Sequence, residues 1–229
     1  MIISKYGIQL ISLKEEDIEL VRVKRNSENI RNTMNYKEII TPEQQKIWFE
    51  KLNNAIYRGE KTSFYFVIHF QGSKIGLING KDIDNDSKTS EGGFFIWEEK
   101  YLGTLLPVMV SIITLDFSFL INDFISNQIK VIKSNTKALN FNKLLGYEVV
   151  SEDSDFFYLT LSKDKYLKKS EGYRKIIGNE TGDFSLLNLS NFSFDDTPDE
   201  ELKRIFPFLP EFQKDLVEKV LKINKRIIT

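Results

Sequence analysis

The stretch Glu98-Glu-Lys-Tyr-Leu-Gly-Thr104 decides the fold, because it joins an apolar strand to an apolar helix through one glycine. Residues 93–97, Gly-Phe-Phe-Ile-Trp, precede it and read as a strand. An apolar run from Leu105 to about Phe124 follows it and reads as a buried helix. The first N–H groups of a helix have no partner within it, and the helix dipole favours negative charge there. The order of strand, glycine loop and helix start therefore predicts an anion-binding site.

The segments on either side predict a mixed α+β fold. Residues 63–70 and 74–79 flank a tight turn, which predicts a β-hairpin. Residues 128–133 predict a strand, and residues 135–145 predict a helix that ends at Gly146. Together with the elements at both ends, the predicted order is β-α-α-β-β-β-α-β-α-β-β, a mixed sheet flanked by helices.

Two capping boxes, in which side chain and backbone donors satisfy each other, predict the starts of the first two helices. They lie at Ser12 and Thr41, and the helices are expected over residues 12–26 and 41–59. The remaining strands are expected at residues 8–11, 147–150 and 155–161. Asp82–Ser90 is expected to be a polar loop.

The composition changes at about Lys163, which divides the chain into residues 1–162 and a C-terminal extension, residues 163–229. We expect the extension to begin with a polar linker and to continue as amphipathic helices, with a further capping box at residues 197–200. Its last helix carries an apolar stripe: Phe212, Leu216, Val217, Val220 and Leu221. The first domain, a second subunit or a partner protein has to cover this stripe, and we expect one of the first two.

The bulk composition excludes several classes of protein. The 229 residues are 41% hydrophobic, carry a formal charge of −1 and give a pI near 6.0, so nucleic-acid and membrane-surface partners are not expected. The chain has no cysteine and one histidine, which excludes disulfides, thiolate chemistry and a multi-histidine metal site. The N-terminus lacks the features of a signal peptide, so we expect a cytoplasmic protein. The apolar run after residue 104 contains Pro107 and Asp116, which favours a buried helix over a membrane span.

Over about residues 6–162, the chain resembles a GCN5-related N-acetyltransferase (GNAT). The resemblance rests on the sheet order, on the glycine loop, and on Asn135-x-x-Ala138 followed by Leu145-Gly146-Tyr147. Three further segments are similar to the branch that acetylates amino-sugar nucleotides, such as the enzymes of the pseudaminic acid pathway: residues 41–49, 75–84 and 91–93. The resemblance implies a GNAT fold, acetyl-CoA as the cofactor, a small-molecule amine as the acceptor, and a plausible homodimer.

The resemblance also implies the residues that hold the cofactor. The family's loop carries a basic residue and glycines whose amides bind the pyrophosphate. Here Lys100 stands for the basic residue, Gly103 matches, and Leu105 stands where glycine or alanine is usual. Thr104 is expected to add a hydroxyl donor, and Asn135 to contact the pantetheine arm or cap its helix. The implied cofactor-binding residues are Lys100, Tyr101, Leu102, Gly103, Thr104, Leu105, Asn135 and Ala138.

Two residues are candidates for catalysis. Asn142 occupies the position at which many members of the family carry a tyrosine that protonates the departing thiolate, so we expect it beside the thiol. Glu91, at the start of a strand, is a candidate general base for the attacking amine, and a solvated strand-end glutamate explains it equally well.

Three more residues are candidates for binding the acceptor. Arg31 suits a diphosphate, and Trp48 suits a sugar or base face, although core packing is the favoured interpretation of this tryptophan. Asp82 suits a hydroxyl group, and a polar hairpin loop is its plainer interpretation. His69, the single histidine, is a possible general base. It falls at the end of an alternating strand, however, and this favours a half-exposed edge position without a catalytic role.

We therefore expect an acetyl-CoA-dependent N-acetyltransferase that acts on a small polar acceptor, with a nucleotide-linked amino sugar as the best candidate. A protein or peptide N-terminal acetyltransferase is one alternative, and its acceptor groove would be open and acidic. A non-catalytic binding or assembly module of the same fold is another, which Leu105 and Asn142 favour.

Overall fold

The computed structural model describes most of the chain: residues 1–57, 63–195, 197, 199, 202–203, 206 and 211–223. Two predictions involve residues outside this set: the end of the helix predicted over 41–59 and the capping box predicted at 197–200. The side chain of Phe212 is also outside the description.

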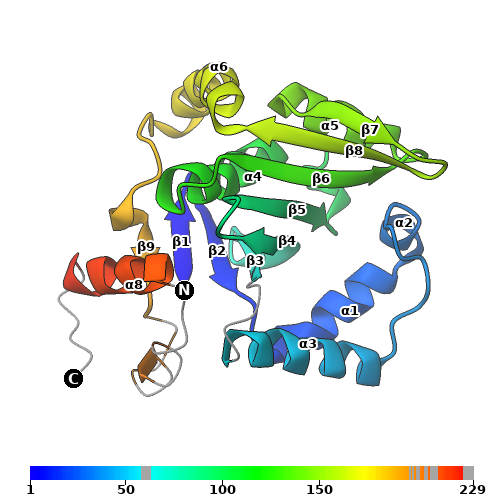
Figure 1. Cartoon of the computed structure of the whole chain (residues 1–229), viewed down its shortest axis with the longest axis horizontal. Coiled ribbons are helices and arrows are strands. Elements are labelled where there is room, and N and C mark those ends of the chain that lie inside the picture. Colours follow the sequence, from blue (N-terminus) through cyan, green and yellow to red (C-terminus); the bar gives the residue numbers. More distant parts are fainter. Residues whose placement is uncertain are drawn as a thin grey trace.

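Nine strands of the described chain form one sheet in the order β7-β8-β6-β5-β4-β3-β2-β1-β9 (Figure 1). Every pair in it is antiparallel except β5 and β6. The strands are β1 Ile2–Lys5, β2 Ile8–Ser12, β3 Phe64–Phe70, β4 Ser73–Asp84, β5 Thr89–Ile96, β6 Ser126–Ile132, β7 Glu148–Glu152, β8 Phe156–Ser162 and β9 Phe192–Ser193. The α+β class is confirmed.

Helices cover both faces of this sheet. They are α1 Ile18–Asn26, α2 Glu28–Arg31, α3 Pro42–Tyr57, α4 Leu106–Asp116, α5 Thr136–Leu145, α6 Lys163–Thr181 and α8 Glu211–Ile223. Val21 of α1 and Ile30 of α2 pack with Trp97 in a small core on one face. The larger core on the other face contains residues of α4, α5, α6 and α8.

The N-terminal region departs from the prediction in two places. The chain begins with an unpredicted hairpin, β1 and β2, whose turn places Tyr6 and Gly7 at φ values of 55° and 74°. The capping box at Ser12 is wrong, because Ser12 is still paired in β2. The backbone N–H of Lys14 instead donates to the Asp17 carboxylate at 3.2 Å, and a 3₁₀ turn over Glu15–Asp17 leads into α1.

The second capping box is confirmed. The Thr41 N–H donates to the Gln44 side chain at 2.8 Å, and the Gln44 N–H donates to the Thr41 hydroxyl at 3.2 Å, directly before α3. The predicted hairpin is confirmed as β3 and β4, with its turn at Gln71 and Gly72. The polar loop at Asp82–Ser90 is shorter than predicted, because β4 continues to Asp84 through a bulge and β5 already begins at Thr89.

The glycine loop leads into α4, as predicted. The buried side chains of α4 lie all around the helix, and the run ends in a π-helical turn over Phe117–Ile121. None of the helices in the described residues is long and apolar enough to cross a membrane. Helix α5 is also confirmed: the Asn135 side chain caps its start, and Gly146 ends it with φ 107°.

The C-terminal extension does not begin with a polar linker. Residues 163–181 form α6, which starts at the side-chain cap of Ser162, ends at Gly182 in a left-handed conformation, and buries Tyr166 and Ile177. A polar composition hid this helix, because only one narrow side of it faces the core. Beyond it, β9 pairs with β1 and extends the sheet.

The apolar stripe of helix α8 packs against the core of the same chain. Leu216, Val217, Val220 and Leu221 are buried in the same core as β1 and α4. Figure 1 shows α8 beside the N-terminal strand, at the opposite side of the molecule from α1, α2 and α3. Of the three partners expected for the stripe, the first domain of the same chain is therefore confirmed.

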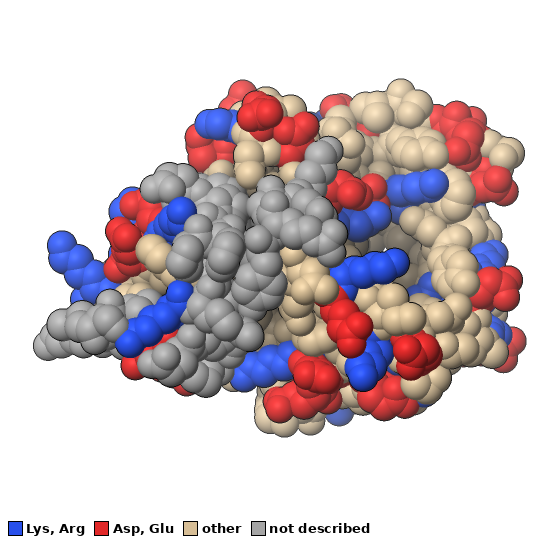
Figure 2. Space-filling model, turned by 60° about the horizontal axis from the view of Figure 1, so that its bottom comes forward, with Lys and Arg blue, Asp and Glu red and all other residues tan. Residues whose placement is uncertain are grey.

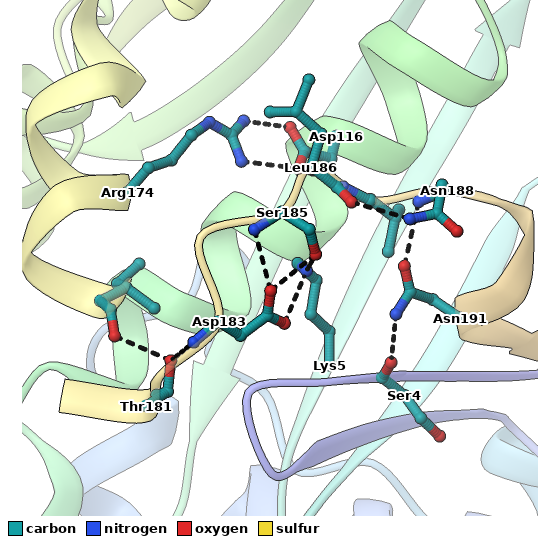
Figure 3. Close-up of polar contacts among 12 residues, drawn as sticks. Ser4, Lys5, Asp116, Arg174, Thr181, Asp183, Ser185, Leu186, Asn188 and Asn191 are labelled. Carbon is teal, nitrogen blue, oxygen red and sulfur yellow. Dashed lines mark hydrogen bonds and ion pairs between the residues drawn. The ribbon is translucent and has the colours of Figure 1, made fainter. Parts of the chain in front are cut away.

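A buried ion pair fixes the extension to α4 (Figure 3). Asp116, at the end of α4 and 0% exposed, accepts hydrogen bonds from both terminal nitrogens of Arg174, from the Tyr166 hydroxyl at 2.5 Å and from the Leu187 N–H at 3.4 Å. Burial works against the charged form of Arg174, but its hydrogen bonds and attraction to Asp116 prevail and raise its pKa. We call Asp116, Tyr166, Arg174 and Leu187 the α4–α6 clamp.

Candidate functional site

The β5–β6 pair opens into a fork. The only parallel pairing among the described strands covers three residue pairs, Thr89–Glu91 with Ser126–Gln128. Beyond Glu91, β5 continues paired only with β4, as far as Ile96, and beyond Gln128, β6 continues paired only with β8. Neighbouring strands in a continuous sheet satisfy each other's backbone groups. Their separation therefore leaves one backbone edge of each strand facing the opening.

The loop of residues 98–105 lies at the end of β5 and starts α4. Gly103 has φ 82°, and a Cβ atom built on it would meet nothing within 4 Å, so the backbone is open to an approaching group. The side chain of Leu105 packs against the main core, and its φ of −72° suits any residue. The leucine that stands in place of glycine or alanine is therefore accommodated by turning its side chain inward.

Thr104, predicted as a hydroxyl donor to the cofactor, forms hydrogen bonds within the loop. Its hydroxyl donates to the Tyr101 carbonyl at 2.8 Å and accepts from the Leu106 N–H at 3.2 Å. The threonine hydroxyl thus bridges the loop and the first residue of α4. Lys100 is exposed, with its ammonium 4.9 Å from the centre of the Tyr101 ring. Leu102 is also exposed, next to Gly103.

Helix α5 lies over β5 just beyond the fork, since the rings of Phe141 and Phe94 are 6.1 Å apart. The Asn135 side chain accepts from the Ala138 N–H at 3.0 Å, which confirms the capping role, and donates to the Thr33 carbonyl at 3.5 Å. The side chain of Asn142 donates to the Ala138 carbonyl at 2.8 Å. All three predicted residues of α5 thus belong to one short network along the helix.

Glu91 lies at the apex of the fork, on the face that α1 and α2 cover. Its carboxylate forms an ion pair with Lys81, its cross-strand neighbour on β4, at 2.7 Å. The same lysine lies 3.7 Å from Asp82, which the β4 bulge holds at φ 50°. The structure therefore brings together Glu91 and Asp82, which were predicted separately.

Tyr65 joins this group and was not predicted. Burial, with added repulsion from the negative charges of Asp82 and Glu91, raises the pKa of Tyr65 to about 12. Its hydroxyl therefore stays protonated at neutral pH. Trp48 packs edge-on against the Tyr65 ring at 5.1 Å, so the tryptophan belongs to the site by way of this contact. The sequence held a signal for this position: Tyr65 lies between Phe64 and Phe66, which face the main core, so its side chain has to point to the opposite face of the strand.

A pocket of about 400 Å³ opens beside Glu91 on this face. It is lined by Glu91, Gln128, Ile129, Lys130, Val150, Ser151, Tyr158, Leu159 and Thr160. The ammonium of Lys130 lies 3.8 Å from the centre of the Phe156 ring and 5.3 Å from that of Tyr158. Lys130 makes no ion pair with a carboxylate in the described part of the chain. In Figure 2, a hollow opens on the face shown, with Lys and Arg side chains along its edge.

Two other candidates lie elsewhere. Arg31 ends α2, two residues before Thr33, and is not part of the pocket lining. His69 pairs with Lys74 near the far end of the β3–β4 hairpin, whereas Tyr65 pairs with Asn79 at the other end. Burial and the nearby Lys74 lower the pKa of His69. Among the described residues, no group of three His, Cys, Asp or Glu side chains is placed to hold a metal ion.

Comparison with known proteins identifies the architecture. No protein-family model and no curated protein matches the chain. A solved structure of FdhC, described as a nucleotide-linked sugar GNAT, matches with a TM-score of 0.66 and 22% identity, over 78% of this chain and 99% of FdhC. The chain has the GNAT fold.

Other solved structures support the same assignment. Spermidine N-acetyltransferase SpeG from Vibrio cholerae, in complex with CoA and spermine, matches with a TM-score of 0.61 and 20% identity, over 71% of this chain and 99% of SpeG. A mutant form of SpeG matches with a TM-score of 0.59 and 22% identity, over 73% of this chain and 100% of that protein. The fork between β5 and β6, the glycine loop and α4 all lie within this fold. At these identities the likeness establishes the fold, and the residues have to carry the argument about function.

Proposed function

We propose that this chain is an acetyl-CoA-dependent N-acetyltransferase whose acceptor is a small molecule with a free amine. The observation that carries the proposal is the fork, which places an open backbone edge between a glycine loop on one side and Glu91 on the other. The GNAT neighbours support the same reaction class.

The residues of the loop fit the cofactor that the fold implies. Gly103 leaves room for a phosphate against the backbone, and the start of α4 attracts negative charge. Lys100 is exposed beside this loop and supplies a cation. Leu105 keeps its side chain in the core and does not block the approach. The bound cofactor would supply the acetyl group as a reactive thioester.

The chain itself would hold the acceptor and take its proton. An amine has to be neutral to attack, and the Glu91 carboxylate stands at the apex of the fork as the group to accept a proton from it. Tyr65, which stays protonated, is available as a hydrogen-bond donor beside Glu91 and Asp82. Asn142 would lie on the cofactor side, where its amide donates to the Ala138 carbonyl. Most of the rate enhancement would come from positioning the two reactants.

The charges of the pocket favour an anionic acceptor over a polyamine. A polyamine needs several carboxylates, but the pocket lining contains one, Glu91, and Lys81 already neutralises it. Lys130 adds a positive charge next to the aromatic ring of Tyr158; it attracts Asp153 but forms no ion pair with a carboxylate in the described residues. This combination suits a phosphate-bearing molecule with a ring to stack, and we propose a nucleotide-linked amino sugar. The single carboxylate also speaks against the acidic groove of a peptide N-terminal acetyltransferase.

We also propose that residues 1–162 carry the reaction and that residues 163–229 support it structurally. The extension adds β9 to the sheet and holds the end of α4 through the α4–α6 clamp.

The test of the proposed function is acetyl transfer by Glu91→Gln. We expect turnover to fall at least tenfold, with affinity for acetyl-CoA unchanged, because only the proton acceptor is lost. Glu152→Gln is the matched control. Glu152 is also a strand glutamate, at the end of β7, and it forms an ion pair with Lys133 at 3.4 Å. Unchanged turnover and an unchanged pH–rate profile in Glu91→Gln would remove Glu91 from the mechanism.

A further inference from the structure

A buried polar network lies at the apex of the fork, on the face opposite Glu91. The side-chain amide of Asn127 on β6 donates to the Ser90 hydroxyl at 2.9 Å and to the Ser90 carbonyl at 3.3 Å on β5. Its carbonyl oxygen accepts from the Tyr147 hydroxyl at 2.5 Å. Asn127 is 4% exposed, Ser90 2% and Tyr147 6%. Buried polar side chains between strands are costly unless they are fully hydrogen-bonded, and here each has a partner.

The Asn127 side chain lies against β5 at the point where the ladder between β5 and β6 ends. Ser90 and Asn127 are directly paired in the parallel ladder, and the next residue on that face of β5 is Gly92. A Cβ atom on Gly92 would lie 3.0 Å from the Asn127 carbonyl oxygen and 3.5 Å from its amide nitrogen. The asparagine amide therefore sits against the β5 backbone at the first residue beyond the last strand pair.

We propose that Asn127 is a positioning residue, a wedge whose amide keeps β5 and β6 apart and whose orientation Ser90 and Tyr147 fix. The wedge sets the width of the fork and thereby the position of the β5 backbone that faces the cofactor. It also sets the position of Glu91, which follows Ser90 directly and ends the ladder. The inference rests on the proposed function, because it assigns the network a role in cofactor binding.

Tyr147 is the part of the network that can be altered with least disturbance. Its hydroxyl remains a donor at all ordinary pH values, because burial raises its pKa well above the normal range. Phenylalanine keeps the ring in the core and removes only the hydroxyl that orients Asn127. The amide is then free to turn, and the fork loses its fixed width.

The test compares Tyr147→Phe with Tyr166→Phe. Tyr166 is also a buried tyrosine, but it belongs to the α4–α6 clamp: its hydroxyl lies 2.5 Å from Asp116 and 3.2 Å from the Ile112 carbonyl, and it accepts from Arg174 at 3.0 Å. Both variants remove the same atom from a buried site, so both are expected to unfold at lower temperature. Only Tyr147→Phe is expected to weaken CoA binding, by about tenfold in calorimetry at a temperature at which both variants are folded. Equal CoA affinity in the two variants would overturn the wedge.

A second variant disturbs the position of the Asn127 amide without removing a hydrogen-bonding group. Gly92→Ala places a methyl group against the Asn127 amide, and we expect a loss of CoA affinity similar to that of Tyr147→Phe. Wild-type affinity in Gly92→Ala would contradict the proposal.

Hydrogen exchange separates a failure of the wedge from a failure of the proposed function. If the wild-type protein binds no CoA, the proposed function fails, and the wedge is judged by amide exchange of residues 92–95. The wedge predicts exchange at least tenfold faster at these amides in Tyr147→Phe than in Tyr166→Phe. Equal exchange in the two variants would refute it.

Discussion

Removing the arginine of the α4–α6 clamp is expected to be one of the most destabilising single changes in this chain. Arg174→Ala takes away two charge-assisted hydrogen bonds and leaves the fully buried Asp116 carboxylate with the Tyr166 hydroxyl and the Leu187 N–H. Breaking a buried ion pair by deleting one partner costs about 3–5 kcal/mol, because an uncompensated charge stays buried. For a chain of this size each kcal/mol corresponds to about 2–4 °C in Tm, so we expect a decrease of about 10 °C.

Urea unfolding followed by circular dichroism measures this loss, with Lys219→Ala as the control. Lys219 forms an exposed ion pair with Asp215 on α8, and removing such a pair costs about 0–1 kcal/mol. Adding Asp116→Asn to Arg174→Ala is expected to recover part of the loss, since an unpaired amide is less costly to bury than a carboxylate. A loss below about 1 kcal/mol in Arg174→Ala, or a further loss on adding Asp116→Asn, would refute the clamp.

Three further predictions concern the site and its surroundings. Lys130→Gln is expected to raise KM for a nucleotide-linked amino sugar at least tenfold, since a charge-assisted hydrogen bond contributes about 1.5–3 kcal/mol. Steady-state kinetics measures this change, and an unchanged KM would exclude Lys130 as the anion contact. Gly103→Ala and Gly72→Ala each force a side chain into a left-handed backbone with open space around it, so each is expected to cost about 1–2 kcal/mol of stability; only Gly103→Ala is expected to weaken CoA binding in calorimetry, and an equal effect of both would contradict the loop assignment. The pKa of His69 is lowered in the folded protein, so the unfolded chain binds its proton more readily; stability is expected to fall as the pH falls below about 6.5, less steeply in His69→Gln, and identical pH dependence in both proteins would contradict this.

Capping residues in the sequence correctly predicted the helix ends that are determined by contacts between residues close together in the chain. The helix over residues 136–145 has a capping asparagine before it and a glycine after it, and both act within a few residues. The capping box at Thr41 likewise needs no distant partner. At Ser12 the same pattern failed, because pairing with Phe66 of β3 keeps Ser12 in a strand and moves the cap to Lys14.

The site was predicted only in part, because strand register decides which side chains meet. The sequence pointed to Glu91 and Asp82 one at a time, but Lys81 joins them only through the pairing of β4 with β5. Lys130 faces the same pocket only because β6 separates from β5 and pairs with β8. A single sequence does not contain these pairings. Helix α6 was missed because its composition is polar and only Tyr166, Ser170, Ile177 and Gly178 of it are buried.

The most direct test of the account is calorimetry of the intact chain with acetyl-CoA, compared with desulfo-CoA and ADP. The account predicts micromolar affinity for acetyl-CoA that is lost in Gly103→Ala and reduced in Lys100→Ala, because the glycine loop and α4 would hold the pyrophosphate. Absence of binding at millimolar acetyl-CoA would contradict the acetyltransferase assignment. The chain would then be a binding module that keeps the GNAT fold without its cofactor.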